Sequence, residues 1–518
     1  MATGRILVGI WDQNGNSRLK GIRKIGDETM QSRRQFLGGL AGLAAIPSLL
    51  NVTTSSQKRP NIVLFLVDDL GWGDFGCYGD TFHETPNVGR MASEGMKFTN
   101  AYAAAPVCSP SRASLLTGKW PARLHLTQWI PGVIYPHKKL LEPSQTQHLD
   151  HSIPTITEQL KQVGYQTAAI GKWHLGGDGY LPENFGFDTN IAGNIHGSPP
   201  PPNNYFGPFQ FHNLTGYTKE DYLTEVLTKK MEEFLEQAAP RGPFFLYMAE
   251  YAVHIPLQER QTLVAKYRRK NGDKDEPDPV YAAMVESVDT ALGNLRATLE
   301  RLGVADNTVI ILTSDNGGVG FQGRRLHRIA DNGPLRSGKG FLYEGGIREP
   351  LIAHWPGVTK PGSVCEIPVT GTDLMPTILS MVNAGPAPKP CDGVDISGLF
   401  RGQTSLERNA LYWHYPHYSD QGGTPSGAIR EGDWKLIEFF EDGHVELYNL
   451  ALDPGEQYNF ASSFADKATD LLGKLQIWRE SVNASMPRPN PEYNPAQAEL
   501  RLGPPGCGWN PEASCRED

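Results

Sequence analysis

The sequence predicts an α/β fold, in which a mostly parallel central sheet is sandwiched by helices and a smaller antiparallel-sheet subdomain follows at the C-terminal end. Two continuous β-branched and apolar runs, Asn61–Val67 and Thr308–Ser314, are typical of strands buried on both faces. Segments with apolar residues at helical spacing lie between such runs, and this alternation is typical of α/β proteins. After about residue 400, short strand patterns with turn signals predict the second, smaller sheet.

The remaining elements follow from the same patterns. We expect three further strands of the main sheet, at Thr167–Ile170, Pro243–Met248 and Pro350–His354. Helices are expected between the strands, at Ile153–Val163, Thr218–Gln237 and Val280–Leu302. The small sheet is expected to use Gly427–Arg430, Trp434–Phe440 and Val445–Tyr448, with a hairpin turn at Glu441–Gly443. The 518 residues are too many for one ordinary core. We therefore expect an N-terminal extension (1–58), a main domain (59–400) and a C-terminal subdomain with a tail (401–518).

The N-terminal extension contains an arginine pair, Arg33-Arg34, ahead of the apolar run Phe36–Leu50. This pattern is typical of a twin-arginine export signal, here residues 32–50, and it predicts a periplasmic or secreted protein. The run is too short, and too often interrupted by glycine and proline, to span a bilayer, so we expect no stable membrane insertion. A solvated tail with a chance arginine pair is the alternative.

Charge and cysteine content narrow the function classes. A net charge of −9 argues against a nucleic-acid-binding protein, and any anionic substrate must be held by a few local cations. Export would permit disulfides among the six cysteines, but their spacing does not determine a pairing. The oligomeric state is likewise left open.

Oxygen-bearing side chains follow both long apolar runs. Asp68 and Asp69 come directly after the first run, and Asp315 and Asn316 after the second. In α/β sheets ligands bind beyond the carboxyl ends of the strands, so these four side chains are expected to converge. Oxygen ligands without histidine or cysteine favour calcium or magnesium over zinc. We expect one ion, Ca²⁺ with Mg²⁺ as the alternative; simple turn capping is the competing interpretation.

The segment Cys108–Gly118 reads CSPSRASLLTG. Pro110 fits the first turn of a helix and Gly118 fits its end, which places Cys108 at a positive helix N-terminus. The segment resembles the signature of the sulfatases, in which the cysteine of C-x-P-x-R is oxidised to formylglycine. Further motifs of that family occur in order, at Gly171–Gly176, His254–Pro256, Thr313–Gly318, Arg336–Gly340 and Glu344–Arg348.

The resemblance covers roughly residues 59 to 460 and implies the alkaline-phosphatase-like fold, with residues 59–400 as the catalytic domain. It implies hydrolysis of a sulfate ester, from a sulfated carbohydrate (glycan) or an aryl sulfate, and a formylglycine-generating enzyme as a partner. It also implies a role for each motif residue. Asp68, Asp69, Asp315 and Asn316 match the metal ligands, with residue 108 completing the metal shell; Arg112 steadies the formylglycine; and Lys172, His174, His254 and Lys339 surround the sulfate, with Lys172, His254 and Lys339 in contact with substrate.

In the implied reaction the aldehyde at position 108 hydrates, and one hydroxyl attacks sulfur. His254 or Lys339 protonates the departing alcohol, and His174 then removes the proton of the second hydroxyl so that sulfate leaves.

Two other functions fit parts of the pattern. A phosphomonoesterase or phosphodiesterase of the same superfamily would have similar strand ends, but usually has a serine or threonine nucleophile and two metals. A secreted lectin-like protein would bind sulfated glycans with Cys108 unmodified.

Overall fold

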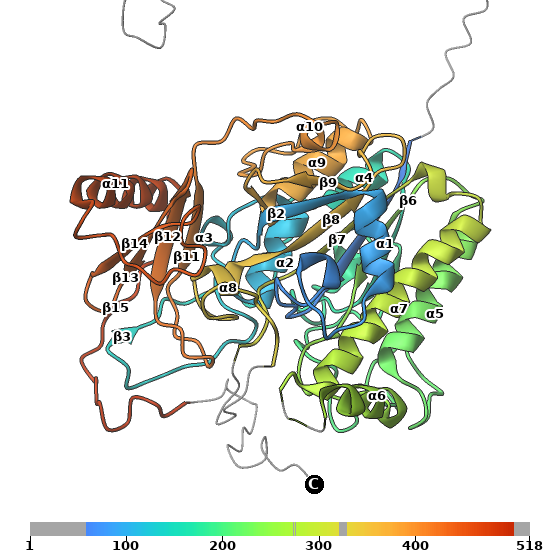
Figure 1. Cartoon of the computed structure of the whole chain (residues 1–518), viewed down its shortest axis with the longest axis horizontal. Helices are drawn as coiled ribbons and strands as arrows, with labels where there is room; N and C mark the ends of the chain where they lie inside the picture. Colours follow the sequence, from blue (N-terminus) through green and yellow to red (C-terminus); the bar gives the residue numbers. More distant parts are fainter. Residues whose placement is uncertain (1–58, 273, 275, 321–328, 502–518) are drawn as a thin grey trace, which may run out of the picture. The chain divides into compact units, whose positions relative to one another are not determined.

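The computed structural model describes residues 59–272, 274, 276–320 and 329–501 (Figure 1). Its central sheet has nine strands in the order β10-β2-β8-β7-β1-β6-β4-β5, with β9 paired to β2. The strands are β1 (Asn61–Val67), β2 (Met96–Tyr102), β4 (Gln166–Gly171), β5 (Thr189–Ile191), β6 (Phe244–Ala249), β7 (Thr308–Ser314), β8 (Arg348–His354), β9 (Ser363–Cys365) and β10 (Val369–Thr370).

The middle of this sheet is parallel. Strand β1 pairs in parallel with β6 on one side and β7 on the other, and β4 and β5 continue the parallel order. Strand β8 runs antiparallel between β7 and β2. Every residue of β1 and β7 is buried, as expected for strands covered on both faces. The mostly parallel sheet predicted from the sequence is confirmed.

Helices cover both faces, as Figure 1 shows. Alternate residues of β1 belong to two different cores: Val63 and Phe65 pack with α1, α5 and α7, whereas Ile62 and Leu64 pack with α2, α4 and α9. The α-helices are α1 (Pro86–Glu94), α2 (Cys108–Thr117), α3 (Pro121–Leu124), α4 (Ile156–Gln162), α5 (Leu223–Ala238), α6 (Gln261–Asn271), α7 (Pro279–Arg301), α8 (Glu344–Ile347), α9 (Leu374–Met381), α10 (Ser397–Phe400) and α11 (Ala465–Ser481). Short 3₁₀ turns occupy Gly76–Tyr78, Pro182–Phe185, Ala305–Asn307 and Gly371–Asp373.

The second sheet is antiparallel and has the order β11-β12-β13-β14. Its strands are β11 (Leu411–Tyr415), β12 (Ser426–Glu431), β13 (Trp434–Phe439) and β14 (Val445–Asn449), and α11 packs on it. The smaller C-terminal sheet and the hairpin between β13 and β14 are thus confirmed. A two-stranded sheet joins β15 (Arg488–Pro489) to β3 (Leu140–Leu141).

Several expectations are left without a test. The arginine pair and the extension 1–58 lie outside the described residues, as do Cys507 and Cys515, and the domain boundary near residue 400 stays a prediction. The described cysteines, Cys77, Cys108, Cys365 and Cys391, are all free thiols. Among the described helices, none combines the length and the apolar character needed to cross a bilayer.

Candidate active site

The ends of two neighbouring strands bring the predicted oxygen ligands together. Val67, the last residue of β1, lies opposite Ser314, the last residue of β7, so the residues after both strands emerge at one edge of the sheet. The Asp69 N–H donates to Asp315 Oδ1 over 3.2 Å, and Asn316 Nδ2 donates to Asp69 Oδ1 over 2.8 Å. Asp68 is buried beside them. The predicted convergence of the four side chains is therefore what the structure shows.

Three buried cations neutralise the three carboxylates. Arg112 Nε, from α2, lies 2.8 Å from Asp315 Oδ2. Lys172 Nζ, one residue beyond β4, lies 2.6 Å from Asp68 Oδ2. Lys339 Nζ lies 2.7 Å from Asp69 Oδ2. Each cation comes from a different segment of the chain, so the fold as a whole, and no single element, assembles the cluster.

The charges and the burial of these groups act on their pKa values in opposite directions. Burial alone would raise the pKa of the Asp69 carboxyl, but the charges of Lys339 and His254 outweigh it and hold that pKa below its usual range. For Asp68 burial wins: its pKa is raised well above the usual range despite the Lys172 ammonium. The surrounding cations therefore favour the ionised form of Asp69.

The donor atoms fit a hard divalent cation. Ligand atoms of Asp68, Asp69, Cys108 and His254 all lie within 4.8 Å of one another. Asp68 Oδ1 and Asn316 Oδ1 are buried and have no hydrogen-bond partner among the described residues. Buried polar oxygens that no protein group satisfies usually bind a water molecule or an ion. The carboxylate and amide oxygens of Asp68, Asp69 and Asn316 suit calcium or magnesium.

Cys108 is the first residue of α2. The N-terminal end of a helix carries unpaired N–H groups and the positive end of the helix dipole. All ten residues of α2 are buried, and the helix ends at Gly118, whose φ of 66° is the left-handed conformation expected of a helix-terminating glycine. The predicted helix bounds are confirmed. The side chain at position 108 thus lies at a buried, electropositive helix end beside the acidic cluster.

His174 is buried two residues beyond Lys172. Its Nε2 lies 2.5 Å from the Ile130 carbonyl oxygen, and because a carbonyl can only accept, Nε2 carries the proton of that hydrogen bond. Burial, reinforced by the charge of Lys172, holds the pKa of His174 well below its usual range, so the ring is neutral. Its Nδ1 is then an unprotonated acceptor, and it has no partner among the described residues.

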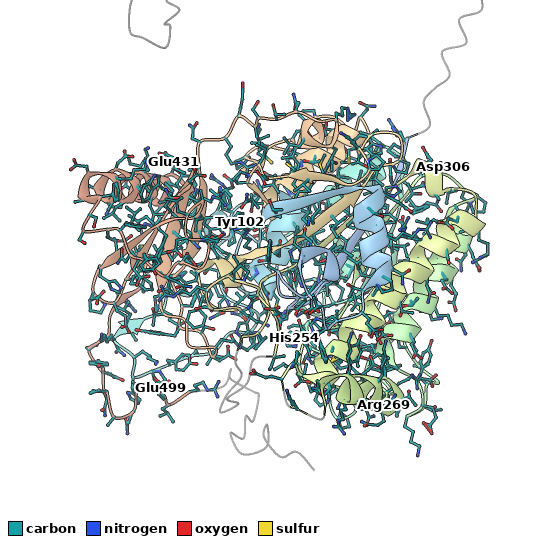
Figure 2. All side chains as sticks on the ribbon, viewed as in Figure 1. Tyr102, His254, Arg269, Asp306, Glu431 and Glu499 are labelled. Atoms are coloured by element: carbon teal, nitrogen blue, oxygen red, sulfur yellow. The ribbon has the colours of Figure 1, made fainter. Side chains whose placement is uncertain are left out.

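His254 lies at the rim of the cluster, and Figure 2 marks its position. Its Nε2 is 3.5 Å from Asp69 Oδ2, and its side chain keeps 13% of its surface exposed, more than any of the three cations. The Tyr205 hydroxyl donates to the His254 carbonyl over 2.8 Å and anchors the backbone there. His254 is thus placed between the buried acidic cluster and the solvent.

Comparisons with known proteins agree on one family. Residues 60–384, more than half of the chain, match the family model described as Sulfatase, and residues 337–479 match the model described as N-sulphoglucosamine sulphohydrolase, C-terminal. The chain belongs to the sulfatase family. It is therefore a sulfuric ester hydrolase.

Individual relatives of this sulfatase cover most of its length. Arylsulfatase A of Homo sapiens is 31% identical over an alignment 514 residues long. The alignment covers 88% of this chain and 95% of the relative. N-acetylgalactosamine-6-sulfatase of Mus musculus is 32% identical, with 90% and 94% covered. The crystal structure of Ps i-CgsB in complex with k-i-k-neocarrahexaose has a TM-score of 0.69 at 28% identity, with 84% and 95% covered.

Three positioning residues of the sulfatase site were not predicted from the sequence, because they act through a hydroxyl, through the backbone or through small size. Ser109 Oγ donates to the His174 carbonyl over 2.9 Å and accepts from the Ile130 N–H over 3.0 Å. A Cβ built on Gly197 would lie 2.5 Å from His174 Cε1, so only glycine fits against the ring. Neither Gly197 nor Ile130 belongs to one of the sulfatase motifs, so no sequence signal marked either residue.

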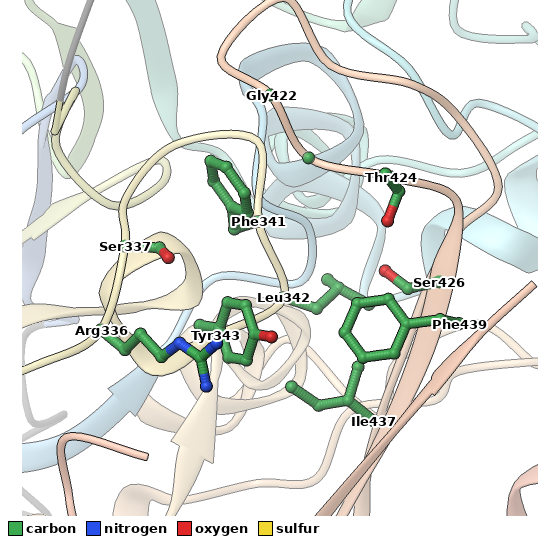
Figure 3. Close-up of a pocket in the computed structure, with 11 residues that line it drawn as sticks. Arg336, Ser337, Phe341, Leu342, Tyr343, Gly422, Thr424, Ser426, Ile437 and Phe439 are labelled. Carbon is green, nitrogen blue, oxygen red and sulfur yellow. The ribbon is translucent and has the colours of Figure 1, made fainter. Parts of the chain in front are cut away.

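A cavity of about 320 Å³ lies between the segment around Lys339 and the C-terminal sheet (Figure 3). Phe341, Tyr343 and Phe439 supply rings to its wall. Its one cation, Arg336, is already engaged: Nη1 donates to the Tyr448 hydroxyl and to the Glu456 carbonyl, each over 2.9 Å, and the guanidinium stacks 3.8 Å from the Tyr343 ring centre. This cavity therefore offers rings and hydroxyls, but no uncommitted positive charge.

Proposed function

We propose that this sulfatase removes sulfate from a sulfated carbohydrate, with a formylglycine made from Cys108 and one calcium ion. The single observation that carries the proposal is the buried cluster at the ends of β1 and β7. It combines three carboxylates, three cations and a helix N-terminus that begins at residue 108. A bound divalent ion would favour the ionised form of Asp68. The three carboxylates would then balance the three cations, and the ion would leave the site net positive, which suits a sulfate ester anion.

The ion would be held by Asp68, Asp69, Asp315 and Asn316, together with residue 108. When present, calcium supplies positive charge and the hydrated aldehyde at position 108 supplies hydroxyl groups for attack and release. The protein's own cations would hold the sulfate oxygens: Lys172 and Lys339 border the acidic cluster on two sides. Arg112 is fixed by Asp315 and by the Lys172 carbonyl, to which Nη1 donates over 2.9 Å, and so would orient residue 108.

His174 is suited to act as the base. Its Nε2 proton is committed to the Ile130 carbonyl, which leaves the Nδ1 lone pair free to take a proton from a hydroxyl at position 108. The neutral state of the ring fits this role, because a protonated imidazole has no lone pair to offer. His254 and Lys339, next to Asp69, are placed to protonate the departing sugar oxygen, which leaves as a hydroxyl.

The proposed substrate class follows from the relatives. One is named N-acetylgalactosamine-6-sulfatase, and one solved structure contains k-i-k-neocarrahexaose. An exported enzyme would meet such sulfated glycans outside the cell. We propose export through Arg33-Arg34, together with oxidation of Cys108 by a formylglycine-generating enzyme before the chain folds, because Cys108 is only 2% exposed in the folded protein.

A substrate screen tests the proposed activity. We expect sulfate release from sulfated monosaccharides and oligosaccharides of the galactose and N-acetylgalactosamine series, and from 4-nitrophenyl sulfate as a small aryl ester. Hydrolysis of 4-nitrophenyl phosphate should be far slower. A higher kcat/KM on the phosphate, or activity on the aryl ester with none on any sulfated sugar, would contradict the proposal.

Metal removal tests the proposed ion. After chelation, calcium or magnesium should restore activity and raise Tm, because only the folded state holds the ligands together. Asp315→Ala should abolish calorimetric calcium binding, since it removes a ligand charge and the nearer of the two carboxylates paired with Arg112. Asp306→Ala, which alters an exposed acid just before the start of β7, is the matched control and should bind calcium normally. Selective rescue by zinc would rule out the assignment.

A further inference from the structure

We propose that a second cavity, distinct from that of Figure 3, binds the sulfated sugar unit next to the one whose sulfate is removed. It lies between the segment 128–147 of the main domain and residues 486–488 near the C-terminal end, and we call it the distal subsite. Its volume is about 650 Å³, within the range of small-molecule sites. This inference rests on the proposed function and extends it from one sugar to its neighbour.

The wall of the distal subsite is built firmly. Strand β15 pairs with β3, which places Arg488 opposite Leu141. Two residues further on, the buried Asn490 side chain donates to the carbonyl oxygens of Pro136 and Lys138 over 2.9 and 2.8 Å. The C-terminal segment is thereby fixed along the edge of segment 128–147, so Arg488 has a defined place in the fold.

Arg488 is the free charge of the distal subsite. It is exposed, and no described residue forms an ion pair with it. The acidic residue in the lining, Glu142, is already committed: one oxygen lies 2.9 Å from His417 Nδ1 and the other accepts from the Tyr418 N–H. An arginine without a carboxylate partner is suited to bind the planar oxygens of a sulfate by paired hydrogen bonds.

Exposed apolar surface accompanies this charge. Ile134 and Met486 line the same cavity and keep 54% and 46% of their surface exposed. The exposed polar side chains of Ser144 and Gln147 also line the cavity. A sulfated pyranose presents an apolar C–H face, several hydroxyls and an anionic group. The distal subsite offers a partner for each of the three.

The distal subsite lies next to the catalytic groups. Its lining includes Pro131, and the residue before it, Ile130, holds the His174 ring through its carbonyl and the Ser109 hydroxyl through its N–H. Ser109 in turn follows Cys108. The cavity lined by His354 and Trp355 lies instead at the opposite edge, since His354 pairs with Ile310 near the start of β7. The position of the distal subsite therefore suits an adjacent sugar.

Arg488→Ala tests the inference by comparing substrates of different length. We expect kcat/KM on a sulfated tetrasaccharide or hexasaccharide to fall about tenfold, the loss of one charge-assisted contact, with kcat/KM on 4-nitrophenyl sulfate unchanged. Arg488→Lys should recover part of the loss. Arg269→Ala, at an exposed arginine of α6 marked in Figure 2, is the matched control and should leave both substrates unaffected.

Direct binding supplies a readout that does not need turnover. Calorimetric titration of Cys108→Ala with size-graded sulfated oligosaccharides should show tighter binding from monosaccharide to tetrasaccharide, and the gain should vanish in Cys108→Ala plus Arg488→Ala. An equal loss on short and long ligands, or no loss on either, would overturn the distal subsite. If the wild-type protein neither hydrolyses nor binds any sulfated sugar, the proposed function itself fails, which is a different outcome.

Discussion

Two residues of the site adopt a backbone conformation that side chains rarely tolerate. Asp69 and His174 both have φ of 59°, in the left-handed region, at a cost of roughly 1–3 kcal/mol each. Hydrogen bonds hold both in place: the Asp69 N–H donates to Asp315 and the His174 N–H donates to the Asn194 carbonyl over 3.0 Å. Two of the nine described non-glycine residues with positive φ are thus an acidic residue of the cluster and the proposed base.

Gly197→Ala tests the contact that orients His174. The added methyl would lie 2.5 Å from His174 Cε1, so the ring must shift, and its hydrogen bond to the Ile130 carbonyl is disturbed. We expect kcat on 4-nitrophenyl sulfate to fall at least about tenfold while the protein stays folded, because small displacements of catalytic groups are costly. Gly177→Ala is the control, since its nearest contacts are at an ordinary 3.5 Å from the Ile195 side chain. Wild-type kcat in Gly197→Ala would contradict the orienting role.

The sequence predicted the residues of the site that carry charge or reactive atoms, because each stands in a motif of fixed spacing. Asp68 and Asp315 were predicted because they directly follow apolar runs typical of buried strands. Cys108 was predicted because Pro110, two residues later, fits the first turn of a helix. The role of Ile130 could not be predicted from the sequence, since it acts through its backbone carbonyl, which every residue has. Whether each placed side chain performs its implied role stays a prediction, for the mutational tests to decide.

Among the elements, strands with continuous apolar sequences were predicted almost to the residue, and β1 and β7 match their predicted bounds. Strand β2 was missed for a physical reason. Its sequence, MKFTNAY, alternates buried and partly buried positions, and its pairing with β8 shifts register between Phe98 and Ala101. A strand with this pattern lacks the uninterrupted apolar run that marks a central strand. The pattern of apolar residues thus predicted the central strands of the sheet better than the strands on the side of β2.

The end of β6 carries a buried carboxyl whose effect on stability can be measured. Glu250 follows β6, is fully buried, and neither side-chain oxygen has a hydrogen-bond partner among the described residues. Burial raises its pKa from the usual 4.5 to about 8. The folded state therefore keeps a proton that the unfolded state loses above pH 4.5. The stabilising effect of that bound proton is complete below pH 4.5 and is lost as the pH rises through 8.

Urea unfolding at fixed calcium concentration checks this prediction. Relative to Glu250→Gln, the free energy of unfolding of the wild type should fall by about 1.4 kcal/mol per pH unit between pH 5 and pH 8. The Glu250→Gln variant is the reference for the wild type, because the glutamine side chain is neutral over this whole pH range. Parallel pH profiles for the two proteins would show that Glu250 is already ionised in the folded state.

For the molecule as a whole, the C-terminal sheet is tied to the main sheet by buried charges. Lys435, on β13, lies 2.9 Å from Glu344 Oε1 and 2.9 Å from Glu456 Oε1, and all three side chains are fully buried. Glu344 begins α8, five residues after Lys339. Removing one member of such a buried set is strongly destabilising, because it leaves an uncompensated charge. The sequence predicted the second sheet, but not this network, since ion pairs between distant segments leave no periodic pattern.

The central claim, that residue 108 is the nucleophile and must be a formylglycine, is tested most directly by Cys108→Ser. Serine keeps one hydroxyl at the start of α2 but has no second one for His174 to deprotonate, so a sulfate accepted from substrate cannot be expelled. After incubation with 4-nitrophenyl sulfate, we expect an intact-protein mass increase of one SO₃ group and negligible steady-state turnover, with no adduct in Cys108→Ala. Sustained turnover by Cys108→Ser at the wild-type rate, without an adduct, would contradict it.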